Sequence, residues 1–294
     1  MNSIPNTRPP IPQPSTPKNR VPAGACDCHF HVFDGPSPQI AERSYTAVPA
    51  PMSAYNTVQS ALGIDRAIIV QPSVYGTNNQ TTLQSLPKDG SMKAIIVVDD
   101  TIEIEELRDL ADQGAVGVRV NMLFSSDARL ANLSKLARKM AELDWHFQVL
   151  ADVSELPNLA EFVNRLPVPV VFDHMGHMPT AKGINNPGFK CLLNLLEDEQ
   201  VWVKLSGAYR VAPSSSHDYQ EVAPIAKALV AANSDRLVWG SDWPHPSFDG
   251  HMPDDGDLMD ILFDWANTET AEKILVDNPE QLYGFEKLGM SNEK

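Results

Sequence analysis

The amino-acid sequence predicts a single (β/α)8 barrel, an α/β fold of the TIM-barrel type, and three observations support this prediction. First, a chain of 294 residues with 43% hydrophobic residues can bury the core of one barrel-sized domain. Second, eight short β-type runs alternate with helical patterns along the chain. Third, the runs are apolar on both faces, which is typical of parallel strands covered by helices.

The predicted strands and helices alternate along the whole chain after its first residues. Strands are expected at 25–33, 66–73, 92–99, 115–122, 145–152, 168–174, 201–206 and 237–242. Helices are expected at 54–62, 102–113, 128–143, 155–165, 188–197, 219–232, 257–265 and 269–283. An open, doubly wound sheet is the alternative fold. It would need a glycine-rich turn after the first strand, and residues 34–38 (Asp-Gly-Pro-Ser-Pro) lack that fingerprint.

The N-terminal segment differs in composition from the rest of the chain. Its prolines stand among polar residues, at Pro5, Pro9, Pro10, Pro12, Pro14 and Pro17. Such a composition cannot build a packed core and favours extended, mobile chain. We therefore expect a disordered Pro-rich arm over residues 1–21, followed by the barrel domain over residues 22–294.

The formal net charge of −15 argues against nucleic acid or an anionic membrane surface as the main partner, because phosphate binding needs a basic face. A small anionic substrate stays compatible with this charge, since it needs only one or two local arginines. Three cysteines and the lack of an apolar run of membrane-spanning length indicate a reduced, cytoplasmic setting. The sequence leaves the oligomeric state open.

The first predicted strand contains the run Asp-Cys-His-Phe-His at residues 27–31. Side chains two residues apart in a strand point to the same face, so His29 and His31 should project together. Paired imidazoles can hold a divalent cation, although His-x-His also occurs in strands by chance. Cys26 and Cys28 are expected in the core, because free cysteine is among the most buried residue types.

Polar residues also end two later predicted strands. His174 follows one apolar run, and Asp242 follows another. Parallel α/β barrels place their chemistry at the C-terminal ends of the strands, so these two residues should converge with His29 and His31. Three imidazoles and a carboxylate form a ligand set suited to Zn²⁺. A carboxylate beside such a site can also take a proton from water.

Other polar residues stand near predicted strand ends or inside strands. Arg119, Lys204 and Arg210 should reach the same end of the barrel. For Lys204 we expect a structural pairing with an acid, and a carboxylated, metal-bridging lysine is the alternative. His146, between two aromatic residues, is expected to be a core histidine.

Loops at this end of the barrel supply further candidate substrate contacts. The long connection at residues 34–52 could bring Tyr45 over a ligand. Ser73 and Thr77 follow the second predicted strand, where substrate contact and hydrogen bonding within the loop are equal alternatives. His245, shortly after the last predicted strand, is a further candidate.

Four motifs together resemble the amidohydrolase superfamily. In chain order they are Asp-x-His-x-His at 27–31, Asp-His-Met-Gly at 173–176, Trp-Gly-Ser-Asp-Trp-Pro-His at 239–245 and Asp-Asn-Pro-Glu-Gln-Leu-Tyr-Gly-Phe at 277–285. More narrowly, they resemble the branch that contains 2-pyrone-4,6-dicarboxylate lactonase and 4-sulfomuconolactone hydrolase. The match runs from about residue 22 to residue 285, nearly the whole predicted barrel.

This resemblance implies an enzyme that hydrolyses a lactone by attack of water at the ring carbonyl. Carried over residue by residue, it implies that Asp242 is the general base. It also implies that His29, His31 and His174 polarise the carbonyl, either directly or through Zn²⁺.

The resemblance further implies that Arg119 and Arg210 hold anionic groups of the substrate. This chain differs from pyrone-dicarboxylate lactonase at two places that affect the choice of substrate. Pyrone-dicarboxylate lactonase has a Lys-Arg pair where this chain has Ser125 and Ser126, and its expected tyrosine is Leu150 here. With two anion-holding groups fewer, a muconolactone with a carboxylate and a sulfonate is favoured. The best match is conversion of 4-sulfomuconolactone to maleylacetate and sulfite in the breakdown of aromatic compounds.

Several alternatives to this function stay open. Within the same fold they are 2-pyrone-4,6-dicarboxylate hydrolysis, hydrolysis or isomerisation of a sugar lactone, and metal-dependent decarboxylation. A binding protein without activity is the alternative outside enzymes. It would be favoured by loss of a histidine or of the late aspartate, and this chain has all of them.

Overall fold

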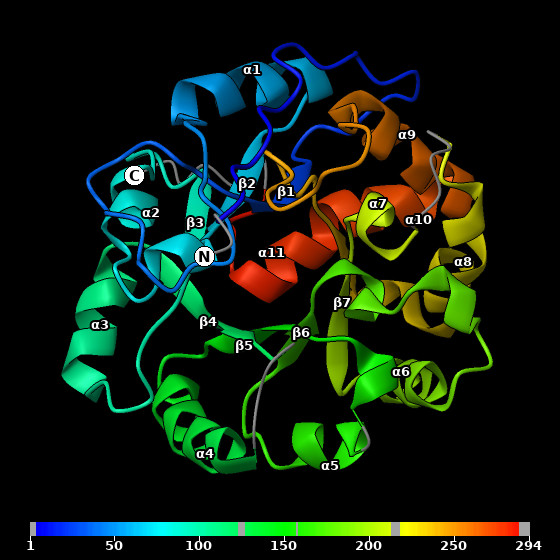
Figure 1. The fold of residues 1–294 in the computed structure, drawn as a ribbon. Coiled ribbons are helices and arrows are strands. Elements are labelled where there is room, and N and C mark those ends of the chain that lie inside the picture. Colours follow the sequence, from blue (N-terminus) through cyan, green and yellow to red (C-terminus); the bar gives the residue numbers. More distant parts are fainter. Residues whose placement is uncertain (1–3, 123–126, 157, 213–217, 288–294) are drawn as a thin grey trace.

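The computed structural model describes residues 4–122, 127–156, 158–212 and 218–287. Eight parallel strands stand in chain order around a barrel (Figure 1), which confirms the predicted (β/α)8 fold of a single domain. A parallel bridge between Phe30 and Trp243 brings the segment that follows the last strand against the first strand. The strands are β1 (Cys26–Phe30), β2 (Arg66–Val70), β3 (Met92–Ile96), β4 (Ala115–Asn121), β5 (His146–Leu150), β6 (Val170–Phe172), β7 (Val201–Leu205) and β8 (Leu237–Trp239).

Helices form a ring outside the strands (Figure 1). They are α1 (Met52–Leu62), α2 (Gln80–Gln84), α3 (Ile104–Asp112), α4 (Asp127–Ala141), α5 (Leu159–Asn164), α6 (Pro187–Glu197), α7 (Ala208–Val211), α8 (Ala223–Asn233), α9 (Asp255–Trp265), α10 (Thr268–Glu272) and α11 (Asn278–Tyr283). The prediction missed α2 and α7, which are too short to show a helical period. The predicted helix at 269–283 is α10, a π-helical turn (Lys273–Asp277) and α11. Within the described residues, no helix has the length and apolar character needed to cross a membrane.

Local sequence explains where several helices begin and end. In α3, Glu103 and Glu106 form a reciprocal capping box that satisfies backbone N–H groups of the first turn. Helix α6 begins after Asn186, whose side chain accepts from the N–H of Gly188. Helix α1 ends at Gly63, which has a φ of 71°, a left-handed conformation that glycine adopts without a steric penalty.

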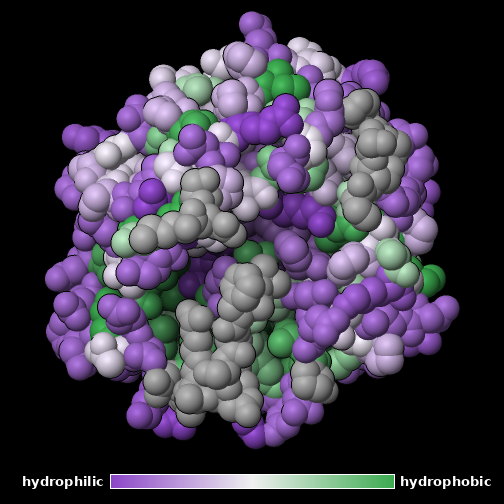
Figure 2. Space-filling view, viewed as in Figure 1, coloured by the Kyte–Doolittle hydropathy of each residue, from purple (hydrophilic) through white to green (hydrophobic). Residues whose placement is uncertain are grey.

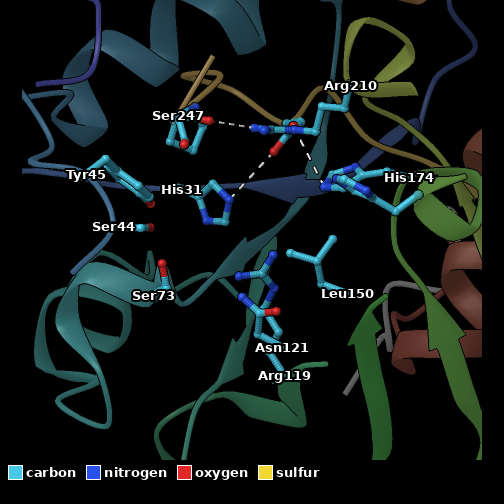
Figure 3. A pocket seen from close by; sticks show the side chains of 13 residues that line it. His31, Ser44, Tyr45, Ser73, Arg119, Asn121, Leu150, His174, Arg210 and Ser247 are labelled. Atoms are coloured by element: carbon cyan, nitrogen blue, oxygen red, sulfur yellow. Dashed lines mark hydrogen bonds and ion pairs between the residues drawn. The ribbon is translucent and has the colours of Figure 1, made fainter. Parts of the chain in front are cut away.

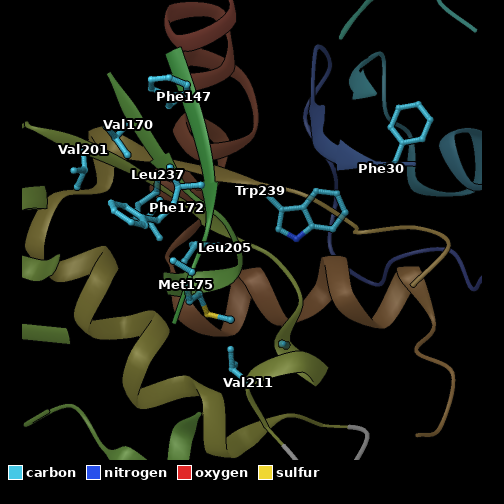
Figure 4. Close-up of a cluster of buried hydrophobic side chains, with 14 of the residues drawn as sticks. Phe30, Phe147, Val170, Phe172, Met175, Val201, Leu205, Val211, Leu237 and Trp239 are labelled. Carbon is cyan, nitrogen blue, oxygen red and sulfur yellow. The ribbon is translucent and has the colours of Figure 1, made fainter. Parts of the chain in front are cut away.

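An apolar layer joins the barrel to its helices (Figure 4). Phe147, Phe172 and Trp239 from the strands are fully or almost fully buried. They belong to the same hydrophobic cluster as Leu192 of α6 and Leu229 of α8. Burial of a side chain of this size contributes about 1.5–3 kcal/mol. This layer holds the strands, and therefore their C-terminal ends, in fixed positions.

The N-terminal end of the barrel is covered by the C-terminal segment. Arg66, at the start of β2, pairs with Glu280 of α11 at 2.9 Å. Lys93 of β3 donates to the carbonyl oxygen of Tyr283 at 2.7 Å. Figure 1 shows α11 lying across the centre of the ring of helices. These contacts place α11 over the ends at which β2 and β3 begin.

A second hydrophobic cluster fills the barrel beneath α11. Cys26 and Cys28 are fully buried in it, together with Tyr283 and Phe285 from the C-terminal segment. The prediction that both cysteines lie in the core is confirmed. His146 is also buried, with its ring centroid 5.4 Å from that of Tyr283, as expected for a core histidine.

The described part of the N-terminal arm, residues 4–21, runs along the barrel and forms hydrogen bonds to it. Thr7 forms a backbone hydrogen bond to the carbonyl of Thr46 at 2.8 Å. The backbone N–H of Ser15 donates to Asp254, and the N–H groups of residues 18 and 19 donate to Asp260. Proline-rich chain cannot pack a core of its own, but its remaining N–H groups find carboxylate acceptors on and beside α9.

Candidate active site

Loops and strand ends enclose a cavity of about 330 Å³ at the C-terminal end of the barrel. In Figure 3, side chains from several elements surround this common space. A volume of this size suits a small ring compound. The lining residues are His31, Ser44, Tyr45, Ser73, Arg119, Asn121, Leu150, His174, His177, Arg210, Asp242, Pro246 and Ser247.

The two histidines of the first motif meet at this end of the barrel. His29 is the fourth residue of β1, and His31 follows the strand directly. Their Nε2 atoms lie 3.3 Å apart. His31 Nδ1 lies 2.7 Å from the carbonyl oxygen of Val70, which can only accept a hydrogen bond. Neutral His31 therefore carries its proton on Nδ1 and turns the lone pair of Nε2 toward the cavity.

Asp242 lies among the histidines, just beyond β8. Its Oδ1 atom is 3.6 Å from His29 Nε2 and 3.7 Å from His31 Nε2. Burial alone would raise the pKa of Asp242, but the Arg210 guanidinium outweighs burial and holds that pKa well below its usual range. The carboxylate is therefore ionised. Oδ1 has no hydrogen-bond partner among the described residues, so it is free to accept a proton or a cation.

His174 approaches from the loop after β6. Its Nε2 atom is 3.9 Å from Asp242 Oδ2, and its Nδ1 atom is 2.9 Å from the hydroxyl of Ser206. The ring also has little room next to Gly207. A Cβ atom added to Gly207 would lie 2.8 Å from His174 Nδ1, and Gly207 has a φ of 60°. Glycine at position 207 therefore lets the chain turn into α7 against this imidazole.

Burial keeps the site histidines neutral. Desolvation lowers the pKa of His29 to about 3 and lowers the pKa values of His31 and His174 as well. Neutral imidazoles offer nitrogen lone pairs, which are the usual histidine ligands of metal ions.

Two groups of buried side chains come close enough to hold a metal ion. One group is His29, His31 and Asp242, and the other is His29, Asp173 and His174. Within each group the ligand atoms lie within 4.8 Å of one another. The predicted four-residue ligand set is thus divided between two groups that share His29. Nitrogen and carboxylate donors of this kind suit Zn²⁺ or a similar divalent ion.

Asp173 is a central residue that the sequence analysis did not single out. Its Oδ1 atom is 3.3 Å from His29 Nδ1 and 3.7 Å from Lys204 Nζ. Its Oδ2 atom accepts from Gln148 Nε2 at 3.2 Å and from Arg119 Nε at 3.4 Å. Burial alone would raise the pKa of Asp173, but the charges of Lys204 and Arg119 hold that pKa well below its usual range. Lys204 therefore has the structural pairing with an acid that we expected.

Two arginines bring positive charge to the cavity wall. Arg119 comes from β4 and pairs with Asp173 through Nε. Arg210 comes from α7, donates through Nε to Asp242, and donates through Nη2 to the carbonyl of Pro246 at 3.0 Å. The structure brings both predicted arginines to the same cavity as His31, His174 and Asp242. Such a site can take an anionic ligand without leaving its charge unpaired.

The loops contribute some of the predicted contacts and not others. Tyr45 and Ser73 line the cavity, and so does Leu150, where a tyrosine was expected. Thr77 lines a different cavity, between the loops that follow β2 and β3.

His245 is not among the residues that line the cavity with Asp242. It is 1% exposed and lies behind Asp242, with Nδ1 3.0 Å from the hydroxyl of Tyr209. Tyr209 in turn donates to Asp242 Oδ2 at 2.6 Å. Tyr209 was not predicted as a site residue, because its only signal in the sequence is its position beside Arg210. Ser125 and Ser126 lie outside the described residues.

The surface around this end of the molecule is mostly hydrophilic, with small, separate hydrophobic areas (Figure 2). The large hydrophobic side chains exposed among the described residues are Ile4, Ile40 and Ile184. The polar character of the surface agrees with the net charge of −15.

Comparison with known proteins agrees with this geometry. Residues 26–285 match the amidohydrolase family. The chain is 36% identical over 274 residues to 4-sulfomuconolactone hydrolase of Hydrogenophaga intermedia, with 90% of each chain covered. It is 35% identical over 294 residues to a 2-pyrone-4,6-dicarboxylate hydrolase of Comamonas testosteroni, covering 94% of this chain and 95% of that one. The crystal structure of a probable 2-pyrone-4,6-dicarboxylic acid hydrolase from Acinetobacter baumannii, with citric acid bound, matches 89% of this chain and 100% of that chain, with 28% identity and a TM-score of 0.80.

Proposed function

The chain belongs to the amidohydrolase family, and we propose that it is an enzyme that hydrolyses an anionic lactone. The substrate we favour is 4-sulfomuconolactone, with maleylacetate and sulfite as products, in the breakdown of aromatic compounds in the cytoplasm. Relatives named for the hydrolysis of 4-sulfomuconolactone and of 2-pyrone-4,6-dicarboxylate support a lactone ring as the target.

One observation carries the proposal more than any other. Asp242 is a buried, ionised carboxylate with an unpartnered Oδ1 atom, and it stands in a cavity that also holds Arg119 and Arg210. A general base must be ionised and within reach of the water that it activates. An anionic substrate needs positive charge beside the base. The same cavity offers both.

The reaction would begin with water between Asp242 and the lactone carbonyl. Asp242 Oδ1 takes a proton from the water as the new carbon–oxygen bond forms, and the carbonyl π electrons move to oxygen. Collapse of this tetrahedral oxyanion breaks the bond to the ring oxygen. When the released oxygen stands on the sulfonate-bearing carbon, it becomes a ketone oxygen, the carbon–sulfur bond breaks, and sulfite leaves with that electron pair. The step needs no oxidant or reductant.

The arginines support an anionic substrate over a neutral one. Arg119 and Arg210 would each pair with a carboxylate or sulfonate of the ring compound, and a planar guanidinium suits both groups. Leu150, an apolar side chain on the cavity wall, offers no third anion contact. This set of contacts supports a muconolactone with two anionic groups over the pyrone dicarboxylate.

The residues present fit a bound Zn²⁺ ion. His31 turns an Nε2 lone pair toward the cavity, and Asp242 Oδ1 is buried without a hydrogen-bond partner. His29 and His174 would complete the ligands. A bound Zn²⁺ ion would lower the pKa of a coordinated water and polarise the carbonyl.

Metal analysis tests this assignment independently of activity. We expect zinc in the purified protein and its loss from the variant that combines His29→Ala and His31→Ala. Full hydrolysis by metal-stripped protein in the presence of a chelator would contradict a role for zinc. In that case the developing oxyanion would need hydrogen-bond donors on the cavity wall other than His31, which presents a lone pair there.

The proposed activity is tested by product analysis in water enriched in ¹⁸O. The purified protein should consume 4-sulfomuconolactone, place one ¹⁸O atom in the new carboxylate and release one sulfite per lactone. Release of carbon dioxide would support a decarboxylase instead. An isomeric lactone without uptake of water would support an isomerase. Absence of hydrolysis with every anionic lactone offered would overturn the proposal.

A further inference from the structure

The two carboxylate oxygens of Asp242 have different surroundings. Oδ2 accepts from the hydroxyl of Tyr209 at 2.6 Å and from Arg210 Nε. Oδ1 accepts no hydrogen bond from the described residues and faces His29 and His31. The contacts that make the two oxygens differ lie behind the cavity wall. The catalytic role that we derive from this difference depends on the proposed function.

A line of buried side chains continues behind Tyr209, away from the cavity. His245 Nδ1 lies 3.0 Å from the Tyr209 hydroxyl, and His245 Nε2 lies 3.3 Å from Asp255 Oδ1. Tyr209, His245 and Asp255 are 2%, 1% and 0% exposed. Asp255 is the first residue of α9, so the line joins the Asp242 carboxylate to a fixed helix.

The hydrogen-bonding capacity of each group gives this line a direction. A tyrosine hydroxyl has one proton, and Tyr209 donates it to the ionised carboxylate of Asp242. The Tyr209 oxygen must then accept, so His245 carries a proton on Nδ1 and donates it to Tyr209. His245 Nε2 faces Asp255 Oδ1 at 3.3 Å, and neither atom has a hydrogen-bond partner among the described residues. The two hydrogen bonds that link His245 Nδ1, the Tyr209 hydroxyl and Asp242 Oδ2 therefore both run toward Asp242.

We propose that Tyr209 is a positioning residue for the general base, and that His245 and Asp255 act on Asp242 only through the Tyr209 hydroxyl. The line fixes Oδ2 and keeps the plane of the carboxylate constant, so that Oδ1 is the atom presented to water. Without it, Arg210 alone would hold Oδ2, and the carboxylate could rotate about its Cβ–Cγ bond.

Removing the Tyr209 hydroxyl tests this proposal with little change in shape. Tyr209→Phe should lower kcat for the anionic lactone by about 10- to 100-fold, with KM changed by less than about threefold. His245→Ala should lower kcat in the wild-type background and cause no further loss in the Tyr209→Phe background. His245→Asn, which can place an amide near the position of Nδ1, should recover part of the lost rate.

Tyr55→Phe is the matched control. Tyr55 also donates from a buried hydroxyl to a buried carboxylate, that of Asp27, at 3.0 Å, and it lies outside the cavity wall. Both variants lose a tyrosine hydroxyl from a buried aspartate, so both should lower thermal stability. Only Tyr209→Phe should lower kcat by tenfold or more.

The outcomes separate this inference from the proposed function. If wild-type protein hydrolyses the lactone and Tyr209→Phe keeps kcat within twofold, the positioning role is wrong. Additive losses in the Tyr209→Phe, His245→Ala double variant would likewise show that His245 does not act through Tyr209. If wild-type protein hydrolyses no lactone, the proposed function fails instead. A crystal structure of Tyr209→Phe then tests the positioning directly: a rotated Asp242 carboxylate would support it, and an unchanged one would overturn it.

Discussion

The two ends of the barrel interior are built from the same eight strands but hold different kinds of side chain. Beneath α11, the interior contains Cys26, Ile95, Val238 and Tyr283 in an apolar cluster. At the opposite end, buried residues carry charge or hydrogen-bonding groups, and they are His29, His31, Arg119, Asp173, His174, Lys204 and Asp242. One end is filled with hydrocarbon, and the other is filled with ionisable groups around a cavity.

This difference between the two ends explains how the barrel can hold a reactive site. Burying an unpaired charge costs several kcal/mol, so each charge at the polar end needs a partner. Asp173 lies close to Lys204 and Arg119, and Asp242 pairs with Arg210. The apolar end carries no comparable cost. We infer that the apolar end contributes stability and that the polar end contributes chemistry, and variants at the two ends should separate these contributions.

The largest expected effect is on catalysis at the polar end. Asp242→Asn keeps the size of the side chain but removes the base, so kcat should fall by about 10²- to 10⁴-fold. The folded structure should persist, because Asn can still accept from Tyr209 and Arg210. Steady-state kinetics and circular dichroism on the same preparation check both statements. A variant with more than about a tenth of the wild-type rate would show that another group activates the water.

The apolar end should respond in the opposite way. Ile95→Ala removes fully buried methyl and methylene groups from the cluster beneath α11, so the free energy of unfolding should fall by about 2–5 kcal/mol. Because Ile95 does not line the cavity, kcat of the folded variant should stay within twofold. Urea unfolding and kinetics measure the two quantities. A loss of kcat comparable to that of Asp242→Asn would show that the apolar end contributes to catalysis as well as to stability.

Two buried arginines give a matched comparison of smaller size. Arg119→Met at the polar end should raise KM for the anionic lactone by an amount that corresponds to about 1.5–3 kcal/mol. Arg66→Met at the apolar end removes the pair with Glu280, so it should lower stability and leave KM unchanged. Measured KM values for both variants provide the check. Equal KM values would show that charge at the polar end does not hold the substrate.

The smallest effect concerns the arm beside α9. Burial alone would raise the pKa of Asp260, but N–H donors of Lys18 and Asn19 outweigh burial and lower that pKa. A lowered pKa in the folded state means that this contact stabilises the protein above about pH 4, and that the stabilisation is lost as pH falls through the folded-state pKa. Asp260→Asn should cost less than about 1 kcal/mol at pH 7, because the carboxylate is only partly buried and solvent screens its interactions. The difference from wild type should vanish in unfolding experiments at pH 2, and a constant difference would contradict this.

The fold could be predicted because its determinants are local. Each observed strand lies within a predicted apolar run, since strands buried on both faces need apolar side chains throughout. The contacts of the arm could not be predicted in this way. They involve Asp254 and Asp260, more than 230 residues away along the chain, and composition alone does not show such partners.

The candidate site could be predicted in part. His29, His31, His174 and Asp242 end apolar runs, and the barrel brings their side chains together. Asp173 gave a similar signal at the end of β6 but stood next to a stronger candidate. The backbone conformation of the site could not be predicted from the sequence. His174 and Asp242 have φ values of 50° and 63°, which residues other than glycine rarely adopt.

Substrate preference tests the central claim most directly, because the polar end is proposed to bind and open an anionic lactone. The measurement is kcat/KM for 4-sulfomuconolactone, for 2-pyrone-4,6-dicarboxylate and for a neutral lactone of similar size. Two cavity arginines and an apolar Leu150 predict the highest value for the sulfonated muconolactone and the lowest for the neutral lactone. A higher kcat/KM for the pyrone dicarboxylate would contradict the favoured substrate. A higher value for the neutral lactone would contradict anion binding at this end of the barrel.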